Sequence, residues 1–423
     1  MTTPQEDRAA ILARRQRLLA PTYRLFYEQP LQIVRAEGVW MYDEQDRAYL
    51  DAYNNVPVVG HCHPYVVEAL ARQAATLNTH TRYLAEQPLQ LAEELLATMP
   101  KELGSVIFTC TGSEANDLAV RVSKAVTGGS GFIITDFAYH GVTDVIAGMS
   151  PEEGSALGPG VYAVQSPCGA DGAAAFGERI RRCIERMHGD GVRLAALLAD
   201  TIFSSDGVFA DPPGFLADAV RHVHAAGGLF VADEVQPGFG RLGEAMWGFQ
   251  RHGVIPDLVT MGKPMGNGHP VAAVAARPGL FEAFSRRAHY FNTYGGNTVS
   301  CAVALAVLHV IRSEQLLENA RRSGDHLQHG LRTLARRCPA IRDIRGPGLF
   351  IGVELGANSA SGLSGRAETT RVVNGMRRLG VLVGATGRNG DVLKIRPPLT
   401  FERQHADRLL DALDQTLQAN TAA

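Results

Sequence analysis

The stretch LVTMGKPMGNGHP, residues 258–270, places a single lysine at the end of an apolar run. Leu258 to Met261 are typical of a buried strand, and Lys263 follows in a loop of glycine, proline and asparagine. Three roles are open for this lysine: a solvated residue at a strand end, a ligand of a phosphate, or a covalent nucleophile. The small neighbours favour the close approach of a flat group to the backbone.

Seven short apolar runs occupy the middle of the chain and alternate with helix-like stretches. They are rich in β-branched residues and show little polar alternation, which is typical of strands covered on both faces. Between two of them, FLADAVRHVHAAGG (215–228) has one apolar helical face and ends at two glycines. This order predicts an α/β fold with a mainly parallel seven-stranded sheet. The runs are SVIFTC (105–110), GFIITD (131–136), GVYAV (160–164), LAALLAD (194–200), GLFVADEV (228–235), LVTM (258–261) and VAAVAA (271–276).

The pattern changes near residue 300, where long helices replace the alternation. Short strand-like pieces follow at GLFIGVEL (348–355), GVLVGA (380–385) and VLKIRPPL (392–399), and a closing helix occupies roughly 402–419. These pieces indicate a smaller α/β domain, which we expect to be built from both chain ends. The predicted division is an N-terminal segment of the small domain at 1–50, a large domain at 51–305 and a C-terminal small domain at 306–423.

The composition argues against several classes of protein. A formal net charge of −2 over 423 residues gives no support for a nucleic-acid partner. No apolar run reaches the roughly 18 residues of a membrane span. The six cysteines form no C-x-x-C pair, so we expect reduced thiols and a cytoplasmic location. Two histidine pairs, His61/His63 and His222/His224, lack a third ligand at zinc-like spacing, so no metal site is predicted.

Polar residues follow two further strands of the predicted sheet, at the edge where an open parallel sheet binds ligands. Gly112 and Ser113 come after SVIFTC and open a helix, whose N-terminus can hold a phosphate; alternatively, Ser113 is only a helix N-cap. Asp233 ends a buried strand, where a carboxylate needs a cation or strong donors. The alternative for Asp233 is a structural pair with an arginine.

Two common nucleotide motifs do not fit. GFGRLG (238–243) matches G-x-G-x-x-G, but it neither follows its strand directly nor opens a clear helix, which disfavours a dehydrogenase. A Walker-type site around Lys263 would need glycine at 257 and Ser or Thr at 264, where the chain has Asp257 and Pro264. A lysine that forms a Schiff base therefore remains the best interpretation of Lys263.

Together, the three turns supply a phosphate cradle, a buried carboxylate and a lysine on strands of one sheet. Pyridoxal 5'-phosphate (PLP) needs these groups: N–H donors for its phosphate, a carboxylate for its pyridine nitrogen and a lysine for its aldehyde. A non-catalytic binding protein would leave Lys263 and Asp233 without a purpose. We therefore predict a PLP-dependent enzyme.

Four motifs resemble those of the class III aminotransferases, which have PLP fold type I. The resemblance extends from about residue 25 to about residue 418, and the motif set is highly specific for the cofactor and the fold. The motifs are TGSEAND (111–117), DEVQPGFGR (233–241), GKPMGNGHP (262–270) and NTYGGN (292–297).

The resemblance implies roles for five residues around the cofactor ring. Lys263 would form the Schiff base and then move protons at the substrate carbon. Asp233 would pair with the pyridinium nitrogen, and Gln236 would form a hydrogen bond with the ring hydroxyl. Tyr139 would stack on the ring, with His140 beside it.

The resemblance also implies how the phosphate is held. Gly112 and Ser113 would bind the phosphate of their own subunit. Thr293 would reach the phosphate of a neighbouring subunit, which implies a homodimer with shared active sites. The expected partners are therefore a second copy of the chain and small-molecule substrates.

Two sets of residues point to different reactions. Arg396 matches the arginine with which many class III aminotransferases hold the carboxylate of an amino or keto acid, although a structural arginine is the alternative. The family usually backs this arginine with a glutamate before a proline, whereas this chain has Asp200-Thr201. It also has Thr298 where the family commonly has proline.

The segment LNTHTRYL (77–84), together with GKPMGNGHP, is most similar to the phospho-lyase subgroup, which acts on phosphoethanolamine and phosphohydroxylysine. There Arg82, with His80, would meet a leaving phosphate or phosphonate; a solvated Arg82 is the alternative. The leading expectation is amino-group transfer from a primary amine or amino acid to a keto acid. The alternative is a lyase that eliminates phosphate and ammonia from a phosphorylated or phosphonate-bearing amine.

Overall fold

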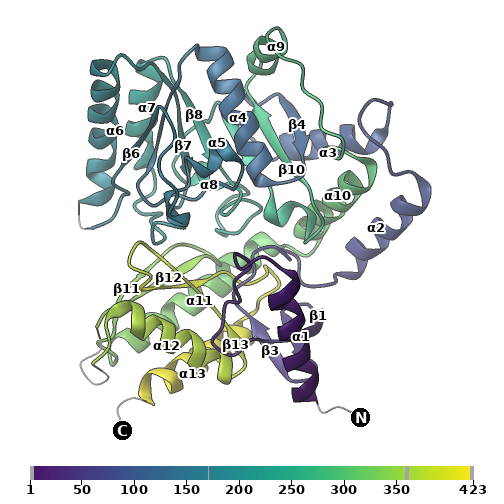
Figure 1. Cartoon of the computed structure of the whole chain (residues 1–423), viewed down its shortest axis with the longest axis vertical. Helices are drawn as coiled ribbons and strands as arrows, with labels where there is room; N and C mark the ends of the chain where they lie inside the picture. The colour runs from purple at the N-terminus through teal and green to yellow at the C-terminus, as the bar shows by residue number, and fades with distance from the viewer. Residues whose placement is uncertain (1–3, 170, 358–361, 420–423) are drawn as a thin grey trace.

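The computed structural model describes residues 4–169, 171–357 and 362–419. The chain forms a larger part around a seven-stranded sheet and a smaller part below it in Figure 1, to which both ends of the chain contribute.

The seven-stranded sheet has the order β4-β10-β9-β8-β7-β5-β6. All seven predicted runs form its strands, which confirms the predicted α/β fold with a mainly parallel sheet. Only β10 departs from the common direction within this sheet, since it pairs antiparallel with both β4 and β9. The strands are β4 (Ser105–Thr109), β5 (Gly131–Thr135), β6 (Val161–Val164), β7 (Leu194–Asp200), β8 (Leu229–Asp233), β9 (Leu258–Met261) and β10 (Ala272–Ala276).

Helices cover both faces of this sheet, which explains why its strands lack polar alternation. In β7, Leu197 and Ala199 belong to one apolar core, whereas Ala196 and Leu198 belong to the other. Helix α4 (Gly112–Thr127) packs into the second core, and α6 (Gly172–Gly189) and α7 (Leu216–Ala225) pack into the first.

The smaller part contains two four-stranded sheets, with orders β1-β2-β3-β13 and β11-β12-β15-β14. In the first sheet β13 pairs parallel with β3, so strands from the two chain ends lie side by side. Their bounds are β1 (Ile33–Glu37), β2 (Trp40–Asp43), β3 (Ala48–Asp51), β11 (Ile341–Arg345), β12 (Ile351–Leu355), β13 (Val381–Leu382), β14 (Gly384–Thr386) and β15 (Val392–Ile395).

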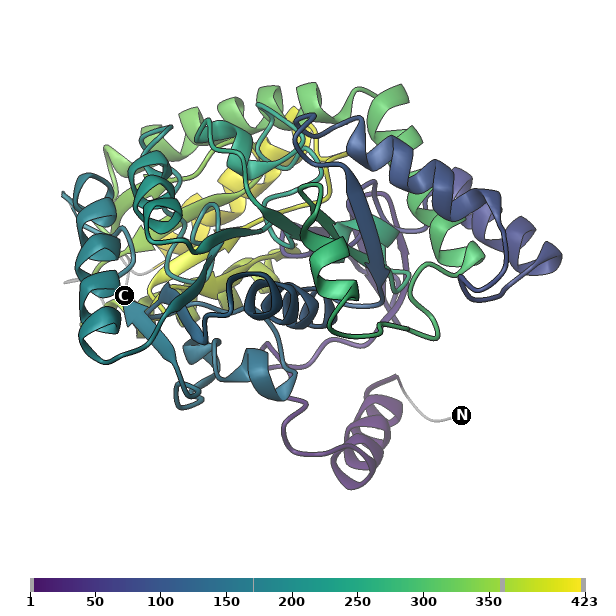
Figure 2. The same ribbon diagram turned by 90° about the horizontal axis from the view of Figure 1, so that it is seen from above.

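The remaining helices complete the chain, and α2 and α3 extend at one side of the molecule in both views (Figure 1, Figure 2). Helix α10 runs through the predicted domain boundary at 305/306, and the division into domains stays a prediction. The helices are α1 (Pro4–Leu18), α2 (Pro64–Thr76), α3 (Glu86–Leu96), α5 (Asp144–Ala147), α8 (Gly248–Arg251), α9 (Leu280–Ser285), α10 (Thr298–Ser313), α11 (Leu316–Ala335), α12 (Gly365–Arg378) and α13 (Arg403–Gln418), with short 3-10 helices η1 (Pro151–Glu153) and η2 (Lys263–Gly266).

The described residues bear on two of the predicted absences, a membrane span and a metal site. Taken singly, no helix there has the length and apolar character to cross a membrane; α10 and α11 meet that test only as a pair, bent by 60°. No group of three or more His, Cys, Asp or Glu side chains in the described ranges is placed to hold a metal ion. His61 and His63 instead contact Asp51 and Glu314.

Candidate active site

The turn that carries Lys263, after β9, lies against the N-terminus of α4. Lys263 opens η2 directly after β9 with a φ of 21°, in a region that residues with side chains rarely adopt. A Cβ on Gly262 would lie 3.2 Å from the backbone nitrogen of Gly112, so a larger residue would crowd this approach. Burial lowers the pKa of Lys263 to about 8, and the positive charge of Arg396 adds to the effect. The lysine can therefore lose its proton close to neutral pH.

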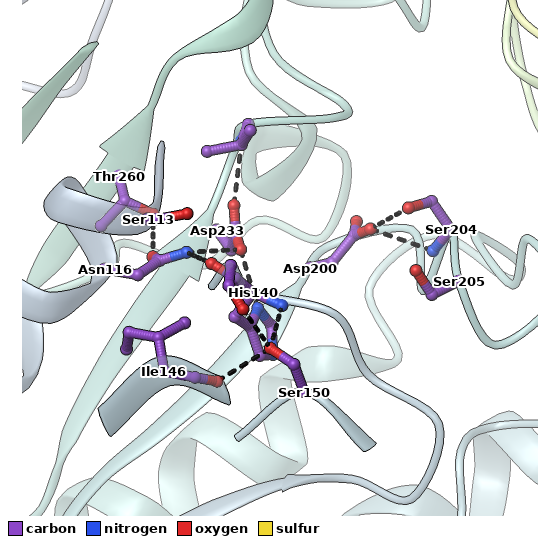
Figure 3. Close-up of polar contacts among 12 residues, drawn as sticks. Ser113, Asn116, His140, Ile146, Ser150, Asp200, Ser204, Ser205, Asp233 and Thr260 are labelled. Carbon is purple, nitrogen blue, oxygen red and sulfur yellow. Dashed lines mark hydrogen bonds and ion pairs between the residues drawn. The ribbon is translucent and has the colours of Figure 1, made fainter. Parts of the chain in front are cut away.

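The Asp233 carboxylate ends β8 and is held by an amide, an imidazole and a backbone N–H. Asn116 Nδ2 donates to Asp233 Oδ2 at 2.9 Å, and His140 Nδ1 lies 2.7 Å from the same oxygen (Figure 3). The backbone N–H of Val235 donates to Asp233 Oδ1 at 3.1 Å. Thr260 on β9 in turn donates its hydroxyl to Asn116 Oδ1 at 2.7 Å. The alternative of a structural pair between Asp233 and an arginine is therefore wrong.

The start of α4 keeps two N–H groups available for an anion. Thr111, not Ser113, is the N-cap: its hydroxyl accepts from the N–H of Glu114 at 3.1 Å. The N–H groups of Gly112 and Ser113 precede the first intrahelical bonds, and they point beyond the helix end. The Ser113 hydroxyl accepts from the N–H of Val142 at 3.1 Å. The reading of Ser113 as a plain N-cap is therefore wrong.

A cavity of about 350 Å³ joins these groups at the carboxyl ends of the parallel strands, where such a sheet is expected to bind ligands. Lys263 Nζ lies 5.7 Å from the centroid of the Tyr139 ring. The predicted residues that line the cavity are Gly112, Ser113, Tyr139, His140, Asp233, Gln236 and Lys263, and the others are Val56, Cys110, Thr111, Gly141, Asp200, Val235, Gly268, His269, Pro270 and Val271.

Arg396 does not line the cavity itself, but its guanidinium binds neutral amide oxygens, one of them on Gln236, which does line it. Its Nη1 donates to Gln236 Oε1 at 2.8 Å and to Asn55 Oδ1 at 3.2 Å. Asn55 Nδ2 also donates to Gln236 Oε1, at 2.8 Å, so the amide nitrogen of Gln236 remains for other partners. Burial lowers the pKa of Arg396, although the group remains a cation at neutral pH.

Asp200 lines the cavity but does not back Arg396. Its Oδ1 accepts from the N–H of Ile202 at 3.0 Å, and its Oδ2 accepts from the N–H of Ser204 at 3.0 Å and from the Ser204 hydroxyl (Figure 3). The shorter side chain of aspartate thus binds its own loop. The clamp that a glutamate forms in the family is not present between Asp200 and Arg396.

Comparison with known proteins identifies the family. Residues 25–417 match the family model "Aminotransferase class-III". This chain is a class III aminotransferase family member. It is 38% identical over 440 residues to the "Alanine--glyoxylate aminotransferase 2-like" protein of Drosophila melanogaster, covering 99% of this chain and 89% of that one. It is 35% identical over 443 residues to "Ethanolamine-phosphate phospho-lyase homolog 1" of Caenorhabditis elegans, and the match covers 98% of this chain and 95% of that one.

A solved structure in this family shares both fold and sequence. The phospholyase from Arthrobacter in complex with phosphoethanolamine has a TM-score of 0.93 and 40% sequence identity, with 97% of this chain and 99% of that chain covered. A transaminase from the marine bacterium Virgibacillus has a TM-score of 0.89 and 25% sequence identity, and the match covers 97% of this chain and 99% of that chain. The class III family thus includes similar proteins that are named for two different reactions.

Pyridoxal phosphate is the cofactor of this family, and the cavity suits it. Lys263 would hold its aldehyde, the N–H groups of Gly112 and Ser113 would hold its phosphate, and Asp233 would pair with its protonated ring nitrogen. When bound, the cofactor supplies an electron sink for charge that develops at the substrate carbon. The donors on Asp233 keep that carboxylate in place at the end of β8.

Three further predicted residues, Arg82, His80 and Thr293, do not line the cavity. Arg82 stacks on Phe291, with its Cζ 4.0 Å from the ring centroid, and its backbone N–H donates to His80 Nδ1 at 3.3 Å. Thr293 is exposed in the loop before α10. A contact of Arg82 or His80 with the substrate stays a prediction, and so does a contact of Thr293 with the cofactor phosphate of a neighbouring subunit.

The structure explains the threonine at 298, where the family commonly has proline. Its hydroxyl donates to the carbonyl oxygen of Leu77, and its N–H donates to that of Thr79 at 3.4 Å. Proline could make neither bond. Thr298 thus joins the start of α10 to the segment 77–84.

Sequence reasoning missed Asn116 and Thr260, which support Asp233. Both are fully buried, and a polar residue inside an apolar element needs a partner. The signal was present: Thr260 is the one polar residue in LVTM, and Asn116 lies one turn into the helix opened by TGSEAND.

Proposed function

We propose that this enzyme is a PLP-dependent phospho-lyase, which eliminates phosphate and ammonia from a phosphorylated primary amine. The proposal rests on the lack of an ion pair at Arg396. Among the described residues no carboxylate pairs with it, because Asp200 binds its own loop and Arg396 donates to the neutral side chain of Gln236. A cation with only neutral partners favours a substrate that is anionic at every stage. The 40% identity to the Arthrobacter phospholyase supports the same reaction.

The reaction needs a base near the carbon that bears the amine. Lys263 is the residue that would accept the proton from that carbon. The electron pair of the C–H bond then forms a double bond to the neighbouring carbon, and phosphate leaves with the electron pair of its C–O bond. Water releases ammonia and an aldehyde, so no oxidant or keto acid is required.

Amino-group transfer is the second candidate. The relatives named alanine--glyoxylate aminotransferase 2 favour it, since an amino acid is also anionic and would suit the charge of Arg396. A primary amine that lacks an acid group would instead leave Arg396 without an anion in a largely buried site, which is costly.

One experiment separates the two reactions. The purified holoenzyme is incubated with phosphoethanolamine in the absence of a keto acid. A lyase releases phosphate and ammonia in equal amounts over many turnovers. A transaminase stops after one turnover with its cofactor in the pyridoxamine form, and pyruvate or 2-oxoglutarate restores the spectrum. The second result would refute the proposal. Lys263→Ala is the control, and we expect it to lose both the visible absorbance of the bound cofactor and the turnover.

We also propose a homodimer with shared sites. The loops that carry Arg82 and Thr293 expose large apolar side chains, as expected of a surface that a partner covers. Leu84 is fully exposed and Tyr294 is 71% exposed. Sedimentation of the holoenzyme should give twice the mass of one chain, and a monomer at micromolar concentration would contradict this proposal.

A further inference from the structure

A second cation, Lys394, stands on the same strand as Arg396. Side chains two residues apart on a strand point to the same face, so Lys394 on β15 faces the same way as Arg396 just beyond its end. Lys394 pairs with Gly352 on β12 and with Gly384 on β14. Its two cross-strand neighbours therefore have no side chains, which leaves the lysine as the only long side chain at that level of these three strands.

This face of β14 and β15 packs on the loop that holds Asp200. Thr386, two residues along β14 from Gly384, donates its hydroxyl to the carbonyl oxygens of Ser204 and Ser205, at 3.1 Å each. At the other end of the face, Arg396 donates to Gln236, which lines the cavity. Lys394 lies between these two contacts, on the side of the sheet that meets the active site.

The Lys394 ammonium has no protein partner in the part of the chain that the structure describes. The residue is only 6% exposed, yet none of the hydrogen bonds or ion pairs there involves it; the ammonium lies 5.9 Å from the Phe350 ring centroid. A largely buried cation without a protein partner is costly, which favours an anionic ligand beside it. Burial and the nearby Arg396 charge together lower the pKa of Lys394 to about 7, and the carboxylates of Glu152 and Asp200 oppose the shift.

We propose that Lys394 determines substrate specificity by binding, together with Arg396, the phosphate group of the substrate amine. This inference rests on the proposed function and names the residues that would recognise the leaving group. A phosphate monoester carries a charge of about −1.5 to −2 at neutral pH, which two cations match better than one. A carboxylate has a charge of −1 and can be satisfied by Arg396 alone. Lys394 would also stabilise the negative charge on the phosphate as it leaves.

The test compares Lys394→Met, which removes the charge from an unbranched side chain, with Lys394→Arg, which keeps it. Lys101→Met, at an exposed lysine before β4, is the matched control. For Lys394→Met we expect the KM for phosphoethanolamine to rise about 10- to 100-fold, as for the loss of one charged hydrogen bond. Lys394→Arg should recover most of this loss. An unchanged KM in Lys394→Met would overturn the proposal.

Binding of inorganic phosphate to the holoenzyme gives a second readout that requires no reaction. Calorimetry should show that Lys394→Met weakens phosphate binding about 10-fold or more, while acetate binding changes little. If the wild type binds phosphate through Lys394 but never releases it from phosphoethanolamine, the proposed reaction fails and the subsite stands. If the wild type eliminates phosphate and Lys394→Met binds phosphate as tightly as the wild type, the subsite fails alone. The visible absorbance of the bound cofactor confirms that each variant is folded.

Discussion

Replacing Thr260 by valine tests whether a chain of buried hydrogen bonds holds the Asp233 carboxylate in place. The Thr260 hydroxyl donates to Asn116 Oδ1 at 2.7 Å, and Asn116 Nδ2 donates to Asp233 Oδ2 at 2.9 Å. Valine has nearly the shape of threonine but has no hydroxyl to donate. Thr260 and Asn116 are both 0% exposed, so no water replaces the lost donor.

The magnitude follows from the Asn116 oxygen that is left without a donor. A buried unsatisfied acceptor costs about 1–3 kcal/mol, more than the ~1 kcal/mol net value of an ordinary hydrogen bond. We therefore expect Thr260→Val to lower the free energy of unfolding by about 2 kcal/mol. If Asn116 turns to find another partner, Asp233 loses a donor; a cost of ~1.4 kcal/mol there corresponds to about 10-fold weaker cofactor binding.

Two measurements check this expectation: the urea midpoint of the apoenzyme and the dissociation constant of the cofactor from visible absorbance. Thr333→Val, at an exposed position on α11, is the control for a generic loss of a hydroxyl. The double variant of Thr260→Val and Asn116→Leu should cost less than the sum of its parts, by about 0.5–3 kcal/mol for coupled residues. The cofactor affinity of Thr260→Val reports whether Asn116 turns away from Asp233, and additive costs in the double variant would show that the three residues do not act as one chain.

Three further substitutions probe close packing, local order and a buried acid. Gly112→Ala places a Cβ 2.9 Å from Val235 Cγ2, so we expect weaker cofactor binding by at least ~1 kcal/mol, measured by absorbance titration. Thr298→Pro removes two donors to the segment 77–84, so limited proteolysis should cut that segment faster than in the wild type. Burial raises the pKa of Asp206 to about 8, so the folded protein keeps a proton on this carboxyl at a pH where the unfolded chain has lost it. The free energy of unfolding should therefore fall as the pH rises from about 4 to about 8, by up to ~1.4 kcal/mol per pH unit. Asp206→Asn should remove that part of the pH dependence in urea unfolding curves, and an unchanged curve would refute the raised pKa.

The cofactor residues could be predicted because each follows a strand of one sheet. Lys263, Asp233 and Gly112 stand directly after apolar runs, and parallel strands bring their carboxyl ends to one edge. The order of strands did not have to be known for this argument. It required only that the runs be strands and that the sheet be mainly parallel, and both properties are visible in the pattern of residues.

The partners of these residues could not be predicted, because they depend on packing between elements that are distant in sequence. Asp233 accepts a hydrogen bond from Asn116, which is 117 positions away in the sequence, and Arg396 donates one to Gln236, which is 160 positions away. The sequence shows Asp200 where the family usually has a glutamate that backs the arginine, but it does not show what Asp200 binds instead. A side chain shorter by one methylene reaches the N–H groups of its own loop instead, which only the backbone path of 202–204 reveals.

The positive and negative charges around the site therefore come from different parts of the molecule, and the packing of the smaller part on the larger sheet brings them together. The sheet supplies Lys263 and the carboxylates of Asp233 and Asp200, whereas β15 and its end supply Lys394 and Arg396. Because Asp200 is bound by its loop, neither cation of β15 forms an ion pair within the described ranges. A site with two such cations beside a lysine of lowered pKa is better suited to a substrate with a doubly charged leaving group than to a neutral amine. We therefore propose that the cofactor residues, which both reactions use, do not decide the reaction type, and that Lys394 on β15 and Arg396 just beyond its end do.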